Sequence, residues 1–531
     1  MSQLPGTPSV SRRNLLRGGV VLGALGATGT LPAVAAQASG GQGFGGQVFG
    51  DRPAFTSGVQ SADVTSRGGL IWARADRAAE MVVEVSTRPD FKSVRRAGVR
   101  KLTAARDFTG VVELNGLPAG SEVYYRVRLN AADNPSRAGA TLTGRLNTAP
   151  EKPSDVSFVW TGDVAGQGWG INPEFGGMKI FEAMRKVRPD FALSSGDNIY
   201  ADGPLAETVA LPDGSVWRNL VVPEKLKVAE TLAEYRGNFR YNLLDENFKR
   251  LNSEVSWIYQ WDDHETVNNW YPGEILNDAR YTEKRVDVLA ANARRAFLEY
   301  APISTASPDG GGRIYRKISY GPTLDVFVLD MRSYKNPNNQ AQRDPAGAAI
   351  LGAEQSQWLI RELDRSKATW KVIAADLPIG LIVPDGADVE AVAQGDGGAP
   401  LGREVEIARV LSSIKKNKVR NTVWITADVH YTAAHHYSPD RAAFKDFDPF
   451  WEFVAGPANA GTFGPNTLES TFGPEAVFVK APPAGQVNLS PKSGLQFFGR
   501  IAIDGSSRAL TVELVDLAGT VVWSKRLPAA R

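Results

Sequence analysis

The chain of 531 residues contains no cysteine. Disulfide bonds and thiolate metal sites are therefore excluded, so any metal must be bound by carboxylate, imidazole, phenolate, amide or backbone oxygen groups. Charge is nearly balanced, with 60 Lys and Arg against 58 Asp and Glu, and this composition indicates neither a nucleic-acid-binding nor a membrane-binding surface. Histidine is scarce: there are four, and three of them lie within residues 422–436. This concentration suggests that the histidines have a chemical role in a functional site.

The chain also lacks a run long enough to span a membrane, but its first 38 residues have the pattern of an export signal. The pair Arg12 and Arg13 precedes a mildly apolar run over residues 18–31, and small residues at 33–38 offer cleavage sites. The apolar run is shorter than the ~20 residues of a spanning helix. A flexible basic tail is the alternative, but the order of the parts favours a twin-arginine signal. We therefore expect export by the twin-arginine machinery to the periplasm or the exterior.

Two patterns follow a glycine-rich linker at residues 39–54. Residues 55–150 contain short strands and turns, which predict an all-β sandwich, and the turn and strand at 116–129 resemble a fibronectin type III domain. Residues 151–531 alternate strands with helices, which predicts a layered α/β domain. The strands of that domain are expected at 156–161, 191–193, 324–329, 370–374, 422–426, 498–503 and 510–514, and its helices at 178–188, 225–236, 286–300, 352–365 and 405–415.

Polar side chains gather where the predicted strands of the second domain end. They are Asp163, Asp197 with Tyr200, Asp376, Asp428 with His430, and the sequence WDDHE at 261–265. Each aspartate alone could be a structural cap. In an ordinary α/β sheet, however, all five points converge on one edge, where so many carboxylates would repel one another unless cations lay among them. Oxygen ligands favour Ca²⁺ or Mn²⁺, and a histidine with a tyrosine also allows Fe³⁺.

Five short sequences in this order resemble the calcineurin-like metallophosphoesterases, and more narrowly the alkaline phosphatase D family. They are GD (162–163), GDNIY (196–200), DDHE (262–265), DLP (376–378) and ADVH (427–430). WDDHETVNNW at 261–270 is highly specific to that family, and LDMRSY at 329–334 and LGAEQSQWL at 351–359 agree with it. The resemblance implies a four-layer metallophosphoesterase β-sandwich flanked by helices and preceded by a fibronectin III-like domain.

The resemblance also implies roles for individual residues, the first group of which would bind one metal. Asp197 matches the aspartate that bridges two metals, and Tyr200 matches the tyrosine ligand of a ferric ion. His430 matches the last histidine of the superfamily's Gly-His-x-His motif. Asp163 stands where the family usually has a cysteine, so an oxygen replaces a sulfur. We expect these residues to hold the first metal together.

A second group would bind the second metal and protonate the leaving group. Asp263 occupies the place of the asparagine in the superfamily's Asn-His pair, and Asp428 matches the first histidine of Gly-His-x-His. Asp376 stands where the superfamily often has a metal-binding histidine. His264 matches the general acid. The added carboxylates favour Fe³⁺ and Ca²⁺ as the two or more ions, with Mn²⁺ or Zn²⁺ as alternatives.

Several polar residues near these motifs have two interpretations. Arg332 either contacts the substrate phosphate or forms a surface ion pair. Asn268 and Asn269 are metal or phosphate ligands, or helix caps. His435 and His436 lie five and six residues past His430, which is poor spacing for one helical face. The sequence favours a surface position for them, or a place behind the ligands, in a further strand.

The sequence therefore predicts an exported metal-dependent phosphoesterase of the alkaline phosphatase D type. Its substrates would be phosphomonoesters or phosphodiesters, attacked by metal-activated hydroxide with a histidine as general acid. A phospholipase D-like diesterase on the same fold is the near alternative. A secreted non-catalytic binding protein with a degenerate site is the rival from another class.

Overall fold

The structure is a computed structural model that describes residues 52–304, 312–339, 343–345 and 347–530. The predicted export signal, and the predicted linker up to residue 51, lie outside the described residues. Within the described ranges, no helix combines the length and the apolar character that a membrane crossing requires.

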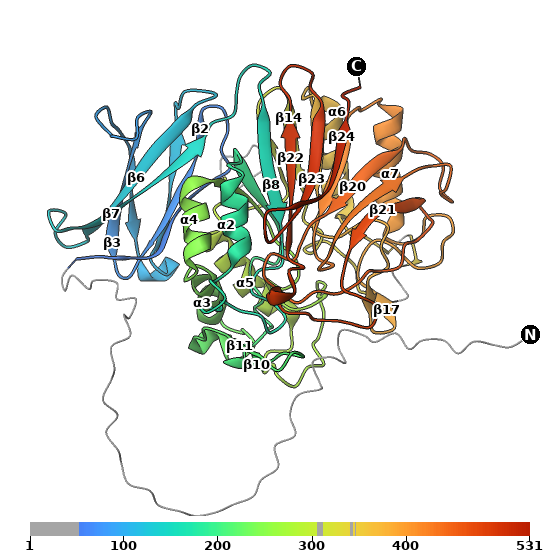
Figure 1. The fold of residues 1–531 in the computed structure, drawn as a ribbon, viewed down its shortest axis with the longest axis horizontal. Helices are drawn as coiled ribbons and strands as arrows, with labels where there is room; N and C mark the ends of the chain where they lie inside the picture. The colour runs from blue at the N-terminus through green and yellow to red at the C-terminus, as the bar shows by residue number, and fades with distance from the viewer. Residues whose placement is uncertain (1–51, 305–311, 340–342, 346, 531) are drawn as a thin grey trace, which may run out of the picture.

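The N-terminal part of the described chain is a seven-stranded sandwich, blue and cyan at the left of Figure 1. Its apolar core includes Ile71, Met81, Val83, Tyr125 and Val127. The expected all-β sandwich is therefore confirmed. One layer contains β1 (Phe55–Ala62), β2 (Gly68–Ala75) and β5 (Thr109–Asn115), and the other contains β4 (Arg95–Leu102), β3 (Ala79–Ser86), β6 (Glu122–Ala131) and β7 (Ala138–Asn147).

Two large sheets form the centre of the remainder, and both are hydrophobic where they face each other. Phe158, Leu193, Val326, Ile425 and Phe453 belong to the buried cluster between them. The first sheet has the order β24 (Val521–Leu527), β23 (Leu510–Asp516), β22 (Phe497–Ile503), β8 (Val156–Thr161), β9 (Phe191–Ser195), β12 (Ser256–Gln260), β1, β2, β5. The second has the order β13 (Arg316–Ser319), β14 (Leu324–Val328), β15 (Trp370–Ala374), β18 (Thr422–Thr426), β20 (Phe450–Val454), β19 (Thr432–Tyr437), β21 (Pro474–Lys480).

Helices cover the outer faces of both sheets, which gives the four layers that the family resemblance implies (Figure 1). Against the first sheet pack α2 (Lys179–Lys186), α3 (Leu232–Asn242), α4 (Glu246–Glu254) and α5 (Val286–Tyr300). Against the second pack α6 (Gly352–Arg365) and α7 (Glu404–Lys416). Short elements complete the described chain: the hairpins β10 (Thr208–Ala210) with β11 (Val216–Arg218) and β16 (Pro384–Asp385) with β17 (Asp388–Val389), and the 3₁₀ turns η1 (Ala104–Arg106), η2 (Pro223–Lys225) and η4 (Pro491–Ser493).

The helices differ from the prediction in two places. The helix expected at 225–236 begins at Leu232, because Thr231 and Glu234 form a capping box that fixes its start. Residues 223–225 form only a short 3₁₀ turn, which Pro223 opens. Helix α4 was not expected, although Asp245 caps it by accepting a hydrogen bond from the backbone of Phe248 at 2.9 Å.

The N-terminal sandwich is joined to the α/β part by a continuous sheet rather than by a flexible contact. Strand β1 pairs in parallel with β12, with Ala62 opposite Trp257. Just past β1, Asp63 forms a buried bidentate ion pair with Arg316, at 2.7 and 3.0 Å. Breaking such a pair typically costs about 3–5 kcal/mol because it leaves a buried charge. The two parts are therefore held in one orientation.

The strand order brings the carboxyl ends of the central strands to a common edge. Strands β8, β9 and β12 are parallel neighbours in one sheet, and β14, β15 and β18 are parallel neighbours in the other. The side-chain amide of Gln260, at the end of β12, donates to the carbonyl oxygens of Leu329 at 2.9 Å and Ala374 at 3.1 Å. This contact joins the two sheets directly below the polar loops.

Candidate metal centre

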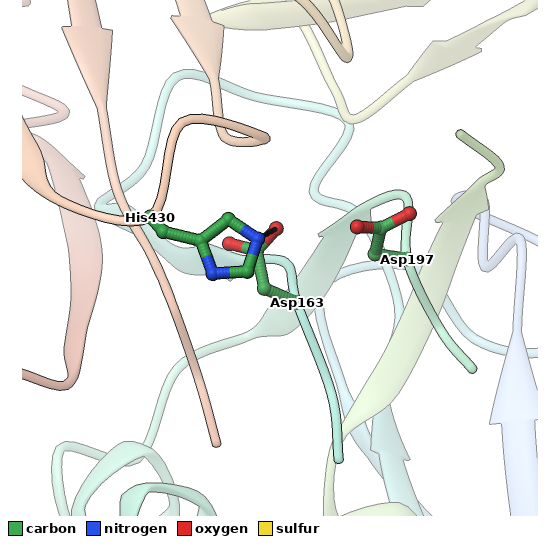
Figure 2. Close-up of side chains that lie close together, drawn as sticks. All are labelled: Asp163, Asp197 and His430. Carbon is green, nitrogen blue, oxygen red and sulfur yellow. Dashed lines mark ion pairs between the residues drawn. The ribbon is translucent and has the colours of Figure 1, made fainter. Parts of the chain in front are cut away.

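Four of the predicted ligands meet where β8, β9 and β18 end. The ligand atoms of Asp163, Asp197 and His430 lie within 4.8 Å of one another, and Figure 2 shows the three side chains facing one another from separate loops. His430 Nε2 is 3.6 Å from Asp163 Oδ1 and 2.8 Å from the hydroxyl of Tyr200. We call Asp163, Asp197, Tyr200 and His430 the first group.

The backbone of these loops is bent sharply to present the side chains. Asp163, Asp197, Asp428 and His430 all have positive φ, at 63, 48, 66 and 62°. Such values are unfavourable for residues other than glycine, and they cluster at functional sites. A Cβ at Gly456 would lie 2.3 Å from Asp163 Oδ2, so only glycine leaves room for this carboxylate.

The orientation of His430 leaves one ring nitrogen for a ligand. Its Nδ1 lies 2.5 Å from the carbonyl oxygen of Gly461, an acceptor that fixes the proton on Nδ1. The lone pair of Nε2 then faces Asp163 and Tyr200. This carbonyl contact is the arrangement commonly found behind metal-binding histidines.

A second group of carboxylates lies beside the first. Asp262, Asp263 and Asp428 have ligand atoms within 4.8 Å of one another, and Asp263 also groups with Asp197 and His264. Asp197 therefore borders both groups, as expected for a residue that bridges two ions. Asp262 was not predicted as a candidate ligand.

Asp376 and Arg332 lie in surroundings that were not expected: each contacts the other inside the protein. Arg332 is fully buried, so the surface ion pair considered for it is wrong. Its guanidinium contacts Asp262 and Glu390 closely, and its Nε lies 3.4 Å from Asp376 Oδ2. Arg332 is absent from the wall of the cavity that His264 and Tyr200 line. Asp376 lies against Arg332, and no triad of ligand atoms within 4.8 Å among the described residues includes it.

The predicted general acid, His264, is held by a carboxylate that was not predicted. Asp202 Oδ1 lies 2.7 Å from His264 Nδ1, and Asp202 Oδ2 accepts from the backbone of Asn268 at 3.0 Å. Burial disfavours the charged ring, but Asp202 and Asp263 outweigh it and raise the pKa of His264 to about 10. His264 therefore carries a proton at neutral pH.

The two asparagines after His264 have different positions. Asn268 lines the cavity. Asn269 is buried, and its backbone donates to Asp263 Oδ2. The side-chain oxygen of Asn269 has no hydrogen-bond partner among the described residues. An oxygen in this state is available to a cation or a donor group.

The residues present fit hard metal ions. The ligand atoms are carboxylate oxygens, a phenol and one imidazole, a donor set suited to Ca²⁺, Mn²⁺ or Fe³⁺. Burial, together with the neighbouring Asp263, raises the pKa of Asp197 well above its ordinary value. Burial likewise raises the pKa of Asp376, with Asp262 adding to the effect. Cations among these carboxylates would relieve that repulsion.

A cavity with a volume of 430 Å³ opens beside His264 and the first group. Tyr200, Asp202 and His264 form its inner wall. Its remaining wall is mixed, with the amides of Gln167, Asn338, Asn339 and Asn488, the apolar Val267, Ile275 and Leu276, and the aromatic Tyr271 and Phe463. The cavity therefore places a ligand next to His264 and the first group.

Other residues that shape the site were missed by sequence reasoning. Glu265 accepts hydrogen bonds from the backbones of Asn198 at 2.5 Å and Asp262 at 2.7 Å, and so ties the turn after β9 to the turn after β12. Glu265 lies within a motif used for the resemblance and Asp202 lies two residues past another, but their roles depend on contacts about 62–67 positions apart in sequence.

The last two histidines lie in β19, away from both groups. This segment was expected to begin a further strand, and it does. His435 is buried and its Nδ1 lies 2.9 Å from Glu452 Oε1. His436 is partly exposed and packs on Trp451, with ring centroids 4.8 Å apart.

This fold and donor set define a metallophosphoesterase. The solved structure titled "Structure of PhoD" matches with a TM-score of 0.67 over 91% of each chain at 21% identity. A purple acid phosphatase from yellow lupin (Lupinus luteus) matches with a TM-score of 0.53 at 13% identity, over 90% of this chain and 74% of the other. At these identities the likeness establishes the fold.

Sequence comparison gives the family. The model of the PhoD-like phosphatases matches residues 158–514, and the model of their N-terminal domain matches residues 43–150. Alkaline phosphatase D of Bacillus subtilis (strain 168) is 27% identical over 442 residues, which cover 78% of this chain and 71% of the relative. The chain belongs to the PhoD-like phosphatase family and is a hydrolase of phosphoric esters.

Proposed function

We propose that this protein is an exported phosphoesterase that hydrolyses phosphomonoesters, phosphodiesters or both outside the cytoplasm. The observation that supports this most strongly is the shared position of Asp197. It borders two groups of candidate ligands, and both adjoin His264 at the wall of a 430 Å³ cavity. This arrangement provides places for two cations and one acid around a single substrate.

Each group suits a different ion. Asp163, Asp197, Tyr200 and His430 would hold Fe³⁺, because a phenolate and two carboxylates favour a trivalent ion. Asp263, which groups with Asp197 on one side and with Asp428 on the other, would hold Ca²⁺ together with these two residues, because Ca²⁺ prefers oxygen ligands. Mn²⁺ or Zn²⁺ are alternatives at either place. When bound, such ions supply a water of lowered pKa and stabilise charge on the phosphoryl oxygens.

The chain's own residues supply the proton. Asp202 accepts a hydrogen bond from His264 Nδ1–H and so leaves Nε2–H as the donor to a leaving oxygen. The ring of His264 lies flat against that of Tyr200, with centroids 4.1 Å apart and planes at 29°. Asp202 and Tyr200 thereby fix both the orientation and the plane of the acid.

The shape of the cavity bears on the substrate. A volume of 430 Å³ exceeds what a phosphate needs, and Ile275, Leu276 and Phe463 add apolar wall. An organic group attached to the phosphate would be accommodated there. This observation favours an ester with a sizeable alcohol, and it keeps a phospholipase D-like diesterase as the second candidate.

The test is a metal analysis of the exported protein together with assays on mono- and bis-(4-nitrophenyl) phosphate. We expect bound metal and hydrolysis of at least one of the two esters. A metal-free protein that hydrolyses neither would support the secreted binding protein instead. Export is tested separately by replacing Arg12 and Arg13 with lysine, which should leave the protein in the cytoplasm.

A further inference from the structure

Arg332 is a fixed cation among the carboxylates of the second group. It follows β14 and none of its side chain is exposed. Its guanidinium contacts Asp262 and Glu390 closely on two sides, and Nε lies 3.4 Å from Asp376 Oδ2. Its Nη2 is 3.6 Å from Asp428 Oδ1 and 3.7 Å from Asp263 Oδ1. One guanidinium thus faces five carboxylates.

Among the described residues, Arg332 is the cation that forms ion pairs with Asp262, Asp376 and Glu390. Arg403 is nearby and buried, but its guanidinium donates to the backbone of Glu390 and to Asn338 Oδ1, away from the aspartates. Lys335 is also buried, and its Nζ reaches the carbonyl oxygen of Glu390 at 3.5 Å. Arg332 therefore compensates Asp262, Asp376 and Glu390, whereas Asp263 also lies beside the charged His264.

The contacts divide the five carboxylates into two sets. Asp262 and Glu390 are in close contact with the guanidinium, and Asp376 is within ion-pair distance of Nε. Asp263 and Asp428 lie within ion-pair distance of Nη2 but beyond hydrogen-bond distance from it. In the second set, Asp263 groups with Asp197. In the first set, Asp376 and Glu390 belong to neither group of candidate ligands, and Asp262 contacts Arg332 closely while its oxygens lie within 4.8 Å of Asp263 and Asp428.

From this division we infer that Arg332 is a positioning residue that occupies part of the acidic site in place of a metal ion. It uses Asp262, Asp376 and Glu390 as its counterions, and it leaves Asp263, Asp428 and Asp197 for a single divalent ion. Asp376 is then a partner of Arg332 rather than a metal ligand. The inference rests on the proposed metal-dependent function.

The physical consequence concerns metal affinity. A fixed positive charge near a cation weakens its binding, and carboxylates without that charge attract a cation more strongly. Replacing Arg332 by an uncharged residue should therefore increase cation binding, although the residue belongs to the site. If Arg332 bound the substrate phosphate instead, its replacement would leave cation binding unchanged and raise KM. The two roles thus predict different measurements.

The experiment is calcium titration by calorimetry of the full chain after chelation, with metal counted by mass spectrometry. We expect Arg332→Gln to bind one additional Ca²⁺, or to bind Ca²⁺ at least about tenfold more tightly. Arg332→Lys, which keeps the charge, should bind like the wild type. Unchanged calcium binding by a folded Arg332→Gln protein, with only KM raised, would overturn the inference.

A matched pair of substitutions covers the case in which Arg332→Gln fails to fold. Asp376→Asn should keep the wild-type number of ions, because Asp376 pairs with Arg332. Asp428→Asn should lose one ion. Loss of an ion from both variants would refute the division. A wild type that binds no cation would instead refute the proposed function, so the two failures are distinct.

Discussion

The imidazole of His264 lies against the ring of Tyr200, with centroids 4.1 Å apart. One residue is the candidate acid, and the other is a candidate ligand whose hydroxyl lies 2.8 Å from His430 Nε2. The acid is therefore held at a fixed distance from the first group by a stacked ring. Asp202 supplies the remaining constraint through Nδ1.

Replacing His264 by alanine should reduce turnover in proportion to how poor the leaving group is. Proton donation contributes about 10²–10⁴-fold when the leaving alcohol needs a proton, and little when it leaves as a stable anion. Hydrolysis rates for an alkyl phosphate ester and a 4-nitrophenyl ester measure this difference. His436→Ala is the matched control, because His436 is partly exposed on β19. An equal loss for both esters would argue against the acid role.

Replacing Asp202 by asparagine should move the alkaline limb of the pH–rate profile to lower pH. The carboxylate of Asp202 favours the charged ring and helps to raise the pKa of His264, so its loss lowers that pKa. The acid then loses its proton at a pH that is about 1–3 units lower. Asp388→Asn, on the cavity wall without a contact to His264, is the control. A limb that stays in place would mean that another group titrates there.

Tyr200→Phe should remove colour if the first group binds Fe³⁺. A phenolate bound to a ferric ion absorbs visible light, so the wild type should be violet and the variant bleached. The visible absorption spectrum checks this. Tyr271→Phe, which alters another tyrosine of the cavity wall, should keep the colour. A colourless but active wild type would show that the ion is not ferric.

The stabilisation of the protein by added metal should be larger at pH 7.5 than at pH 5. Burial and neighbouring carboxylates raise the folded-state pKa of Asp197 above the ordinary 3.8. The folded chain then retains protons that the unfolded chain releases, so the metal-free protein loses stability as pH rises through this window. Added cations replace those protons. Melting temperatures with and without Ca²⁺ at both pH values measure the effect, and an equal shift at both would contradict it.

Much of the α/β fold was predictable because its signals are local. Residues 156–161, 370–374 and 422–426 are apolar runs bounded by polar turns, and each forms the expected strand. Helices α5 and α6 have the predicted bounds because their apolar spacing is regular. Helix α4 escaped prediction because its sequence, ENFKRLNSE, is polar, and only the packing of residues such as Leu251 reveals its buried face.

The convergence of the aspartates was also predictable, because parallel strands end at one edge. What the sequence could not provide was the partner of each side chain. Asp202 and His264 are 62 positions apart, and Arg332 and Asp262 are 70 apart. Neither pairing has a local signature, so Asp202 was missed and Arg332 was assigned to the surface or the substrate. Such contacts depend on the packing of separate loops.

Asp197→Asn provides the most direct test of the central claim, that two groups of ligands share this residue. Metal content per chain and turnover of bis-(4-nitrophenyl) phosphate should be measured on the same preparations, with Asp278→Asn on the cavity wall as control. We predict two or more metal ions in the wild type and the control, and a joint loss of metal and turnover in Asp197→Asn. Full metal content with undiminished turnover in Asp197→Asn would contradict the account.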